Sequence, residues 1–531
     1  MTDFTGTAIL AKLGLRRDRI ILPIWIYVFL AIAFSTPYSY RKLYPTPAAI
    51  AQAGAVITNP AAVALVGPPQ ELTLGGLSAW KIAGFAALAA GLMSILTVIR
   101  HTRAEEETGR QELLGAGVLG RRAPLTAAVT IALGANLAIA IVTALGFIIG
   151  GLPTTGAIAF GLEIAATGWV FTAIAAVAAQ LTENARTANS IATATLGAAY
   201  LLRAIGDTAG PHGPAWLSWL SPIGWSLKID PFGTPHWWIF ALPIAATAIL
   251  TTAGYTLAGH RDLGAGLIAA RPGPATAAPR LRTPLALALR LHRGLLTGWI
   301  IGFAIGGLAT GGIATSLGNM INSSPQVTKL IAEWGGNNGI TNGFLATILS
   351  LFGLIAAIYT IQATLRLRSE ETTQRAEPLL ATRVSRTHLA ASHLTFALLG
   401  TVLLLAVAGI TTGIGYGLGT HHLGTEIPRL LGGALIQTPA TWVLAGIATL
   451  LIGALPRYTA ASWAAVAIAL IISELGPVLQ LGQWAMDISP FTHLPKLPGG
   501  TITATPIIWL LIIAAALTTT GLTTYRRRDI G

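Results

Sequence analysis

The stretch THLAASHLTFALLGTVLLLAVAGITTGIGYGLGTHHLGT, residues 387–425, contains no Asp, Glu, Lys or Arg. Similar uncharged runs lie between Arg293 and Lys329, between Glu333 and Arg366, and between Arg429 and Arg457. Each run exceeds the roughly 20 residues that a helix needs to cross the hydrocarbon core of a bilayer. Only 10% of the 531 residues are charged, whereas 53% are hydrophobic, which is too little charge to cover the surface of a soluble protein. The sequence therefore predicts an all-α polytopic membrane protein.

About twelve transmembrane helices are expected. The apolar runs are continuous and rich in Ala, Leu, Ile and Gly, and this excludes a β-barrel, whose strands alternate apolar and polar residues. The expected spans are 20–36, 79–99, 124–150, 156–180, 188–204, 236–258, 294–317, 343–365, 389–418, 430–455, 459–475 and 502–524.

Basic residues predict the orientation of these spans. If both termini are cytoplasmic, 25 of the 33 Lys and Arg residues fall in inner segments, as the positive-inside rule requires. The net charge of +13 is then a signature of topology, and nucleic-acid binding is not expected. The first apolar run lacks a small-residue cleavage site, so a retained anchor is expected rather than a signal peptide. The absence of cysteine excludes disulfides and thiolate metal sites.

An internal repeat organises the chain. The segment RAEEETGRQELLGAGVLGRRA (103–123) aligns without gaps onto RSEETTQRAEPLLATRVSRTH (368–388), at a constant offset of 265 residues. The matching charged pairs are Arg103 with Arg368, Glu105 with Glu370, Glu106 with Glu371, Arg110 with Arg375, Glu112 with Glu377, and Arg121 with Arg386.

Two other segments recur in the same order. LGLRRDRIILPIWI (13–26) resembles LALRLHRGLLTGWI (287–300), and HRDLG (260–264) resembles the terminal RRDIG (527–531). Each repeat holds six expected spans, an even number, so both halves have the same orientation and form parallel repeats. The predicted organisation is a first repeat over 1–263 with an N-terminal interfacial helix, a Pro-rich cytoplasmic linker over 264–284, and a second repeat over 285–531.

No motif in the sequence predicts catalysis. A P-loop ends in Gly-Lys-Ser/Thr, and none of the six lysines follows a glycine. The sequence has no HExxH, and its ten histidines lack the spacing of metal ligands. We therefore expect no catalytic residue and no metal site in this chain.

The two acidic loops have two interpretations. As a helix, each loop would pair Glu106 with Arg110, Arg103 with Glu107, and Glu371 with Arg375 at i,i+4 spacing, which stabilises a solvated helix. The repetition of the pattern favours the second interpretation, a cytoplasmic protein partner contacted once by each half. Anchoring to anionic lipid is disfavoured, because the glutamates would repel it.

Charged residues within spans are hypotheses for functional sites. The candidate intramembrane polar site consists of Glu163, Arg203 and Asp207, with Arg203 expected to pair locally with Asp207 while its stem extends outward to water. Segments 8–19 and 283–293 are expected either to lie on the inner membrane surface or to extend the following spans into the cytoplasm. Small-xxx-small spacings predict helix packing faces at Gly146/Gly150, at Gly302/Gly306 and at Gly409/Gly413/Gly417.

The whole chain resembles the permeases of type II ABC exporters, and most closely the fused, double-length actinobacterial antibiotic or multidrug (tetronasin-type) exporter permeases. The residues that carry the resemblance are RAEEETGRQELLGAGVLGRRAPL (103–125), LLRAIGD (201–207), WLSPIGW (219–225) and YRRRDIG (525–531).

The resemblance implies a permease in the bacterial plasma membrane that moves hydrophobic drugs, antibiotics or lipid-like molecules outward. It implies two copies of a separate P-loop ATPase subunit that carry the ATP and Mg²⁺, with no cofactor in this chain. Cargo would pass a cavity largely between the second and fifth spans of each half, and no substrate-binding residue is assigned. The implied ATPase-coupling residues are Arg103, Glu105, Glu106, Arg110 and Glu112 in the first loop, and Arg368, Glu370, Glu371, Arg375 and Glu377 in the second. The second loop carries Pro378 and lacks the third glutamate, so the two ATPase contacts are expected to be unequal.

Two alternatives remain. A major facilitator-type, proton-coupled drug carrier also has two parallel six-span repeats, and GAGVLGRRAP (115–124) superficially resembles its Gly/Arg-rich loop. That loop is shorter, however, and is not led by glutamates. A membrane enzyme or scaffold without transport activity is the other alternative.

Overall fold

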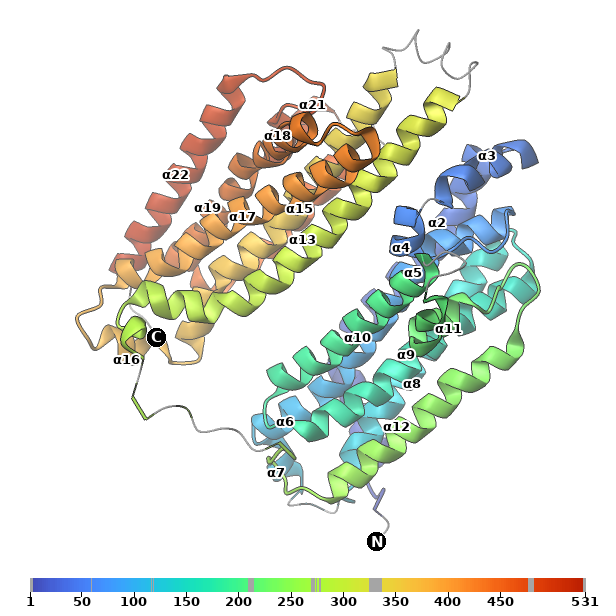
Figure 1. Ribbon diagram of the computed structural model, residues 1–531. Coiled ribbons are helices and arrows are strands. Elements are labelled where there is room, and N and C mark those ends of the chain that lie inside the picture. The colour runs from blue at the N-terminus through green and yellow to red at the C-terminus, as the bar shows by residue number, and fades with distance from the viewer. Residues whose placement is uncertain are drawn as a thin grey trace. The chain divides into compact units, whose positions relative to one another are not determined.

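The structure is a computed structural model that describes residues 3–58, 60–115, 117, 119–208, 214–268, 273, 275–276, 278–323, 337–475 and 482–528. Over these residues the regular secondary structure is entirely helical. The chain forms two compact units, Met1–Gly273 and Pro274–Gly531, and within each of them the long helices run side by side (Figure 1).

The first unit contains the N-terminal helix α1 (Thr7–Arg17) and the long helices α2 (Ile21–Leu43), α5 (Leu74–His101), α8 (Ala123–Ile149), α9 (Thr154–Leu181), α10 (Ala185–Thr208) and α12 (Ala241–Gly259). Shorter helices connect them: α3 (Pro47–Ile57), α4 (Pro60–Val66), α6 (Arg103–Glu107), α7 (Arg110–Gly115), η1 (Ala215–Leu220), α11 (Pro222–Leu227) and η2 (Trp237–Phe240).

The second unit contains the long helices α13 (Pro284–Ser323), α15 (Asn337–Thr372), α17 (Arg386–Thr420), α18 (Leu423–Leu435), α19 (Thr438–Ala454) and α22 (Ala504–Arg527), together with the shorter apolar helix α20 (Ala461–Leu470). Its shorter helices are η3 (Pro279–Leu281), α16 (Ala376–Leu380), η4 (Pro456–Tyr458), η5 (Ile471–Leu475), α21 (Gln483–Met486) and η6 (Pro490–His493).

Ten helices in the described part of the chain are long and apolar enough to cross a membrane, which confirms the all-α polytopic fold. The other two expected spans, 188–204 and 459–475, fall on α10 and on α20 with η5. The 24-residue α10 is long enough to span, but Arg186, Arg203 and Asp207 lower its hydropathy. The apolar helix around α20 is shorter, at Ala461–Ser473.

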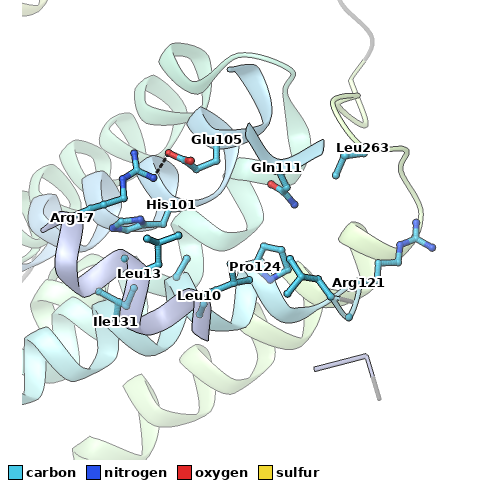
Figure 2. Close-up of a pocket in the computed structure, with 15 residues that line it drawn as sticks. Leu10, Leu13, Arg17, His101, Glu105, Gln111, Arg121, Pro124, Ile131 and Leu263 are labelled. Carbon is cyan, nitrogen blue, oxygen red and sulfur yellow. Dashed lines mark ion pairs between the residues drawn. The ribbon is translucent and has the colours of Figure 1, made fainter. Parts of the chain in front are cut away.

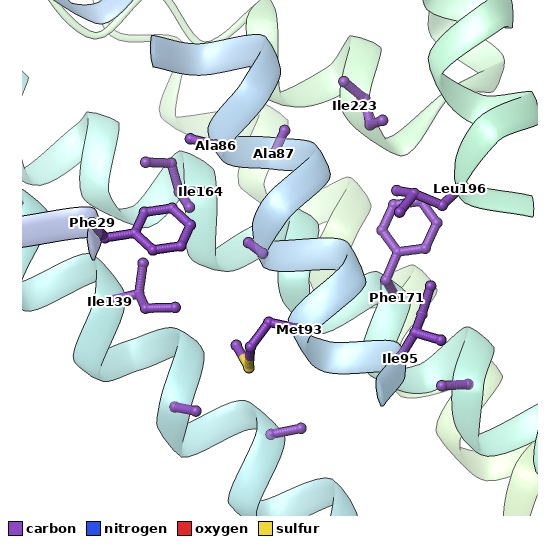
Figure 3. Close-up of a cluster of buried hydrophobic side chains, with 14 of the residues drawn as sticks. Phe29, Ala86, Ala87, Met93, Ile95, Ile139, Ile164, Phe171, Leu196 and Ile223 are labelled. Carbon is purple, nitrogen blue, oxygen red and sulfur yellow. The ribbon is translucent and has the colours of Figure 1, made fainter. Parts of the chain in front are cut away.

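The core of the first unit forms where its long helices meet (Figure 3). Large apolar side chains from six helices interlock there, and α5 and α9 are the most buried of the spans. The labelled members include Phe29 of α2, Met93 of α5, Ile139 of α8, Phe171 of α9, Leu196 of α10 and Ile223 of α11. Because α11 contributes to this core, the segment 214–236 is packed into the bundle rather than lying wholly on its surface.

The two repeats begin differently. In the first unit, α1 is a separate helix, and Asp18 in the following turn is buried against Arg100 and His101 at the end of α5. The repeat alignment places His292 where the first half has Asp18, and His292 lies inside the continuous helix α13. Segment 8–19 therefore contains a distinct helix, whereas segment 283–293 extends a span.

Glycine spacing predicted two of the three proposed packing faces correctly. A Cβ at Gly146 or Gly150 would lie 3.0 Å from atoms of α2, and one at Gly413 would lie 2.7 Å from the Ile427 Cα of α18. The third face, Gly302/Gly306, was right in one half only. A Cβ at Gly306 would lie 3.3 Å from the Phe352 ring of α15, whereas one at Gly302 would have no neighbour within 4 Å. Sequence spacing identifies a smooth face but not whether a helix packs on it.

We expect Gly413→Ala to lower the free energy of unfolding by about 1–3 kcal/mol, because α18 must move away to accept the methyl group. The matched control is Gly302→Ala, which should be neutral or slightly stabilising, since Ala favours the helix. Thermal melting of the purified protein in detergent measures both. Equal melting temperatures for the two variants would contradict the close contact of α17 with α18.

Candidate functional site

The first acidic loop forms two short helices rather than one. Thr102 (φ −121°, ψ −90°) separates α5 from α6, and Gly109 (φ 70°) separates α6 from α7. In the second loop, the repeat-related Gln374 also has a positive φ, of 58°, although this conformation is unfavourable for a residue with a Cβ. Both loops therefore break at the same aligned position, and α7 and α16 follow the break.

Other contacts replace the expected i,i+4 pairs. Glu106 does not pair with Arg110, because α6 ends at Glu107. Arg103 does not pair with Glu107 either, because the Glu107 carboxylate accepts from the backbone N–H of Ala185 (3.0 Å). Arg103 instead pairs with Glu106 at i,i+3, with 2.8 Å between Nη1 and Oε2. In the second loop, Glu371 pairs with Arg368 at i,i+3, with 2.9 Å between Oε2 and Nη1, and not with Arg375.

A buried ionic triad anchors the first loop. The Glu106 carboxylate lies between the guanidinium groups of Arg103 and Arg261, and its shortest contact with Arg261 is 2.6 Å. Arg103, which is fully buried, also donates to the carbonyl oxygen of Ala179 at the end of α9. Arg261 lies just after α12 and donates to the side chain of Gln180 (2.8 Å). The triad thus joins α6 to the C-terminal ends of α9 and α12.

The second unit repeats this triad. Glu371 pairs with Arg368 and with Arg528, which directly follows α22, at a closest distance of 2.5 Å. A further contact recurs as well: Arg121 donates to the carbonyl oxygen of Arg261 (3.1 Å), and Arg386 donates to that of Arg528. The aligned triads are Arg103–Glu106–Arg261 and Arg368–Glu371–Arg528.

Arg261 and Arg528 were absent from the residues expected at the site. Their signal was nevertheless present in the sequence, since each is the second residue of the recurring HRDLG and RRDIG segments. Those segments were recognised as a repeat, but nothing in the sequence linked them to the acidic loops.

The remaining expected residues divide into paired and exposed groups. Glu105 pairs with Arg17 of α1 at 2.7 Å and makes a longer ion pair with Arg110 at 3.7 Å. The repeat-related Glu370 pairs with Arg366 of its own helix (2.7 Å). The exposed residues are Arg110, Glu112 and Leu113 on or beside α7, and Arg375, Glu377 and Pro378 on or beside α16. Only this second group is available to a partner.

The intramembrane candidates form two separate environments. Arg203 pairs with Asp207 as expected, at 3.9 Å, but its stem does not extend outward to water. The guanidinium is fully buried and donates to the carbonyl oxygens of Val63 (3.0 Å) and Leu65 (3.3 Å) at the end of α4. A cation at the C-terminal end of a helix is favourable because of the helix dipole.

Glu163 lies apart from this pair. Within the described residues, no ion pair joins it to Arg203 or Asp207. It lines a small cavity of about 30 Å³ together with Asp230 and Phe232. Its backbone carbonyl accepts a hydrogen bond from Ser226 of α11 (3.3 Å), so this position also connects α9 to segment 214–236.

We expect Glu106→Gln to destabilise the first unit by about 3–5 kcal/mol, because two buried guanidinium groups would lose their counter-charge. Glu112→Gln, which changes an exposed carboxylate six residues away, should leave stability within about 0.5 kcal/mol. Thermal melting compares the two variants. A melting temperature of Glu106→Gln equal to that of the control would show that the triad contributes nothing to stability.

Arg203→Ala should release α4 from α10. Hydrogen exchange in residues 60–66 is expected to accelerate, because the carbonyl oxygen of Val63 loses its buried donor and that of Leu65 keeps only the Tyr200 hydroxyl. Arg186→Ala, an exposed change at the start of the same helix, is the control. Unchanged exchange in Arg203→Ala would indicate that α4 is held by other contacts.

Comparison with known proteins accords with a transport subunit. Residues 281–526 match the family described as "Multidrug efflux system permease Rv1217c, C-terminal domain". Over 532 aligned residues, the chain is 42% identical to the multidrug efflux system permease protein Rv1217c of Mycobacterium tuberculosis, and the alignment covers 100% of this chain and 96% of that protein. This confirms the expected resemblance to multidrug exporter permeases. The chain belongs to the family of multidrug efflux system permeases that includes Rv1217c.

Proposed function

We propose that this multi-pass membrane protein is the permease subunit of an ATP-driven exporter, and that it moves hydrophobic drugs, antibiotics or lipid-like molecules out of the cell. The observation that carries the proposal is the whole-chain identity to a multidrug efflux system permease. Separate P-loop ATPase subunits would bind ATP and Mg²⁺ and supply the energy for transport by hydrolysing the ATP. The chain itself would act as a transport subunit and not as an enzyme.

The docking surfaces proposed for the ATPases are α7 and α16. Each presents an exposed acidic residue, Glu112 or Glu377, followed by an exposed Leu113 or Pro378. Leu113 is 79% exposed, and an apolar side chain that is so accessible beside charged neighbours suits a protein contact. Both surfaces would face the cytoplasm, with the two termini on the same side.

The buried triads support a mechanism of coupling. A rigid ion pair makes the two elements that it joins move together. The first triad joins its loop to the end of α12, and the second joins its loop to the end of α22. A force on α7 would therefore reach α9 and α12 together with α5, and a force on α16 would reach α15 and α22. ATP-driven closure of the ATPase pair would use these connections to shift cargo access from the inside to the outside.

The two contacts are proposed to be unequal. The first loop is tied to α1 through Arg17 and Glu105, whereas Glu370 pairs within its own helix. The surfaces also differ, because Pro378 replaces Leu113. The family relationship disfavours both a proton-coupled major facilitator carrier and a scaffold without transport activity.

Affinity purification of the tagged full-length chain from its native host tests the proposal. We expect the wild type to retain a P-loop ATPase, at two copies per chain. The double variant Glu112→Lys/Leu113→Asp should lose at least about tenfold of the ATPase affinity, as substitution of a hot spot does, with an unchanged melting temperature.

The matched control is Asp262→Lys, which reverses the charge of another exposed acidic side chain close to the first loop. The control should retain the ATPase. Transport by the pure chain with a proton gradient and without any ATPase would overturn the ATP-driven mechanism. Retention of the ATPase by the α7 double variant would instead overturn only the docking surface.

A further inference from the structure

A cavity of about 250 Å³ lies between α1, the first acidic loop and α8 (Figure 2). It is separate from the exposed surface of α7 that is proposed to bind the ATPase. Leu10 and Leu13 of α1 and Ile131 of α8 form an apolar wall, and Leu263 closes the opposite side. The cavity is smaller than the roughly 300–1,000 Å³ of pockets that enclose a drug-sized molecule, so it suits one segment of an elongated ligand.

The polar end of the cavity contains complementary groups. Arg17 and Glu105 meet there at 2.7 Å (Figure 2), and the Arg17 side chain remains 31% exposed. The side-chain oxygen of Gln111, which also lines the cavity, is buried and has no hydrogen-bond partner among the described residues. Arg121 lines the cavity as well and is exposed. A ligand with an anionic group and a hydroxyl donor would satisfy this end.

The charge around the cavity is positive. The charged side chains that line it include two arginines, Arg17 and Arg121, and one glutamate, Glu105. Glu105 offsets the charge of Arg17, and Glu106 is enclosed in its triad. Arg121, which has no ion pair among the described residues, leaves the lining with an excess of positive charge. The repulsion of anionic lipid expected from the sequence is therefore confined to the exposed Glu107 and Glu112.

The helix that borders the cavity has the character of an interfacial helix. Ile9, Leu13 and Leu15 of α1 are 73%, 41% and 52% exposed, although they are large apolar residues beside several cations. Such a helix lies in the headgroup region with its apolar side chains in the acyl layer. Its cavity is then accessible to lipid from the same leaflet.

We propose that this cavity binds an anionic phospholipid of the cytoplasmic leaflet. An acyl segment lies between α1 and α8, the phosphate lies beside Arg17, and a headgroup hydroxyl donates to Gln111. Free phosphate does not use the apolar wall, and a cationic amphiphile is repelled by the basic rim. The bound lipid braces α1 against the loop at the position where Arg17 contacts Glu105.

Native mass spectrometry of the delipidated full-length chain tests this proposal. Phosphatidylglycerol and phosphatidylcholine with identical acyl chains are the probes. We expect the wild type to retain one phosphatidylglycerol in preference to phosphatidylcholine. Arg17→Gln should weaken this retention about fivefold, the loss expected for one basic side chain at an anionic surface, and Leu10→Trp should abolish it by filling the cavity.

Two controls match these variants. Arg16→Gln removes a neighbouring exposed cation, and Ile9→Trp places the same bulky side chain on α1 outside the cavity lining; both should retain phosphatidylglycerol. Equal retention of the two lipids by the wild type would overturn the proposal, as would undiminished retention of phosphatidylglycerol by Leu10→Trp. If Leu10→Trp fails to fold, Arg17→Gln against Arg16→Gln decides the question, and equal losses in that pair overturn it.

Discussion

A carboxylate buried between two guanidinium groups fixes the acidic loop of each unit against the ends of its long helices. Desolvation of three charged groups is costly, and it is offset only when the geometry is good and the remaining donors are satisfied. In the first unit, Glu106 accepts from both arginines, while the spare donors of Arg103 and Arg261 reach Ala179, Gln180 and Ala265. The short helix α6 cannot shift without breaking this network. Its position, and hence the position of α7, is determined by the ends of α9 and α12.

The second triad has the same connectivity but a more accessible environment. Arg103 is fully buried, whereas the side chain of Arg368 is 24% exposed. The first loop is also held by α1, through Arg17, and α1 is in turn held by the buried contacts of Asp18. The second half lacks a separate helix at this position because its first span is continuous through His292. Both halves have thus kept the buried triad that holds the loop, whereas only the first loop is also held by a separate helix, α1.

Several features of the site were predictable from the sequence. The duplicated loop, its gapless register and the pairing of Arg203 with Asp207 all follow from spacing along the chain. Two i,i+4 pairs, Glu106–Arg110 and Glu371–Arg375, were predicted wrongly because a continuous helix was assumed across Gly109 and Gln374. The third, Arg103–Glu107, lies within α6, but both side chains bond to other helices. The prediction that the Arg203 side chain extends outward to water was also wrong, because its guanidinium binds backbone carbonyl oxygens inside the bundle. Its acceptors are carbonyl oxygens about 140 residues away, and backbone acceptors leave no signal in side-chain patterns.

The sequence by itself determined the membrane class, because long runs without charge cannot be solvated as a soluble surface. It also determined the duplication, because matched charges recur in one register. Only the tertiary structure decided which charges of the loops are enclosed and which are exposed. Glu106 and Arg261 are separated by 155 residues, and their contact depends on where α5 and α12 end. The physical reason is that ion pairing acts over a few ångströms, whereas a sequence records only which charges exist and in what order.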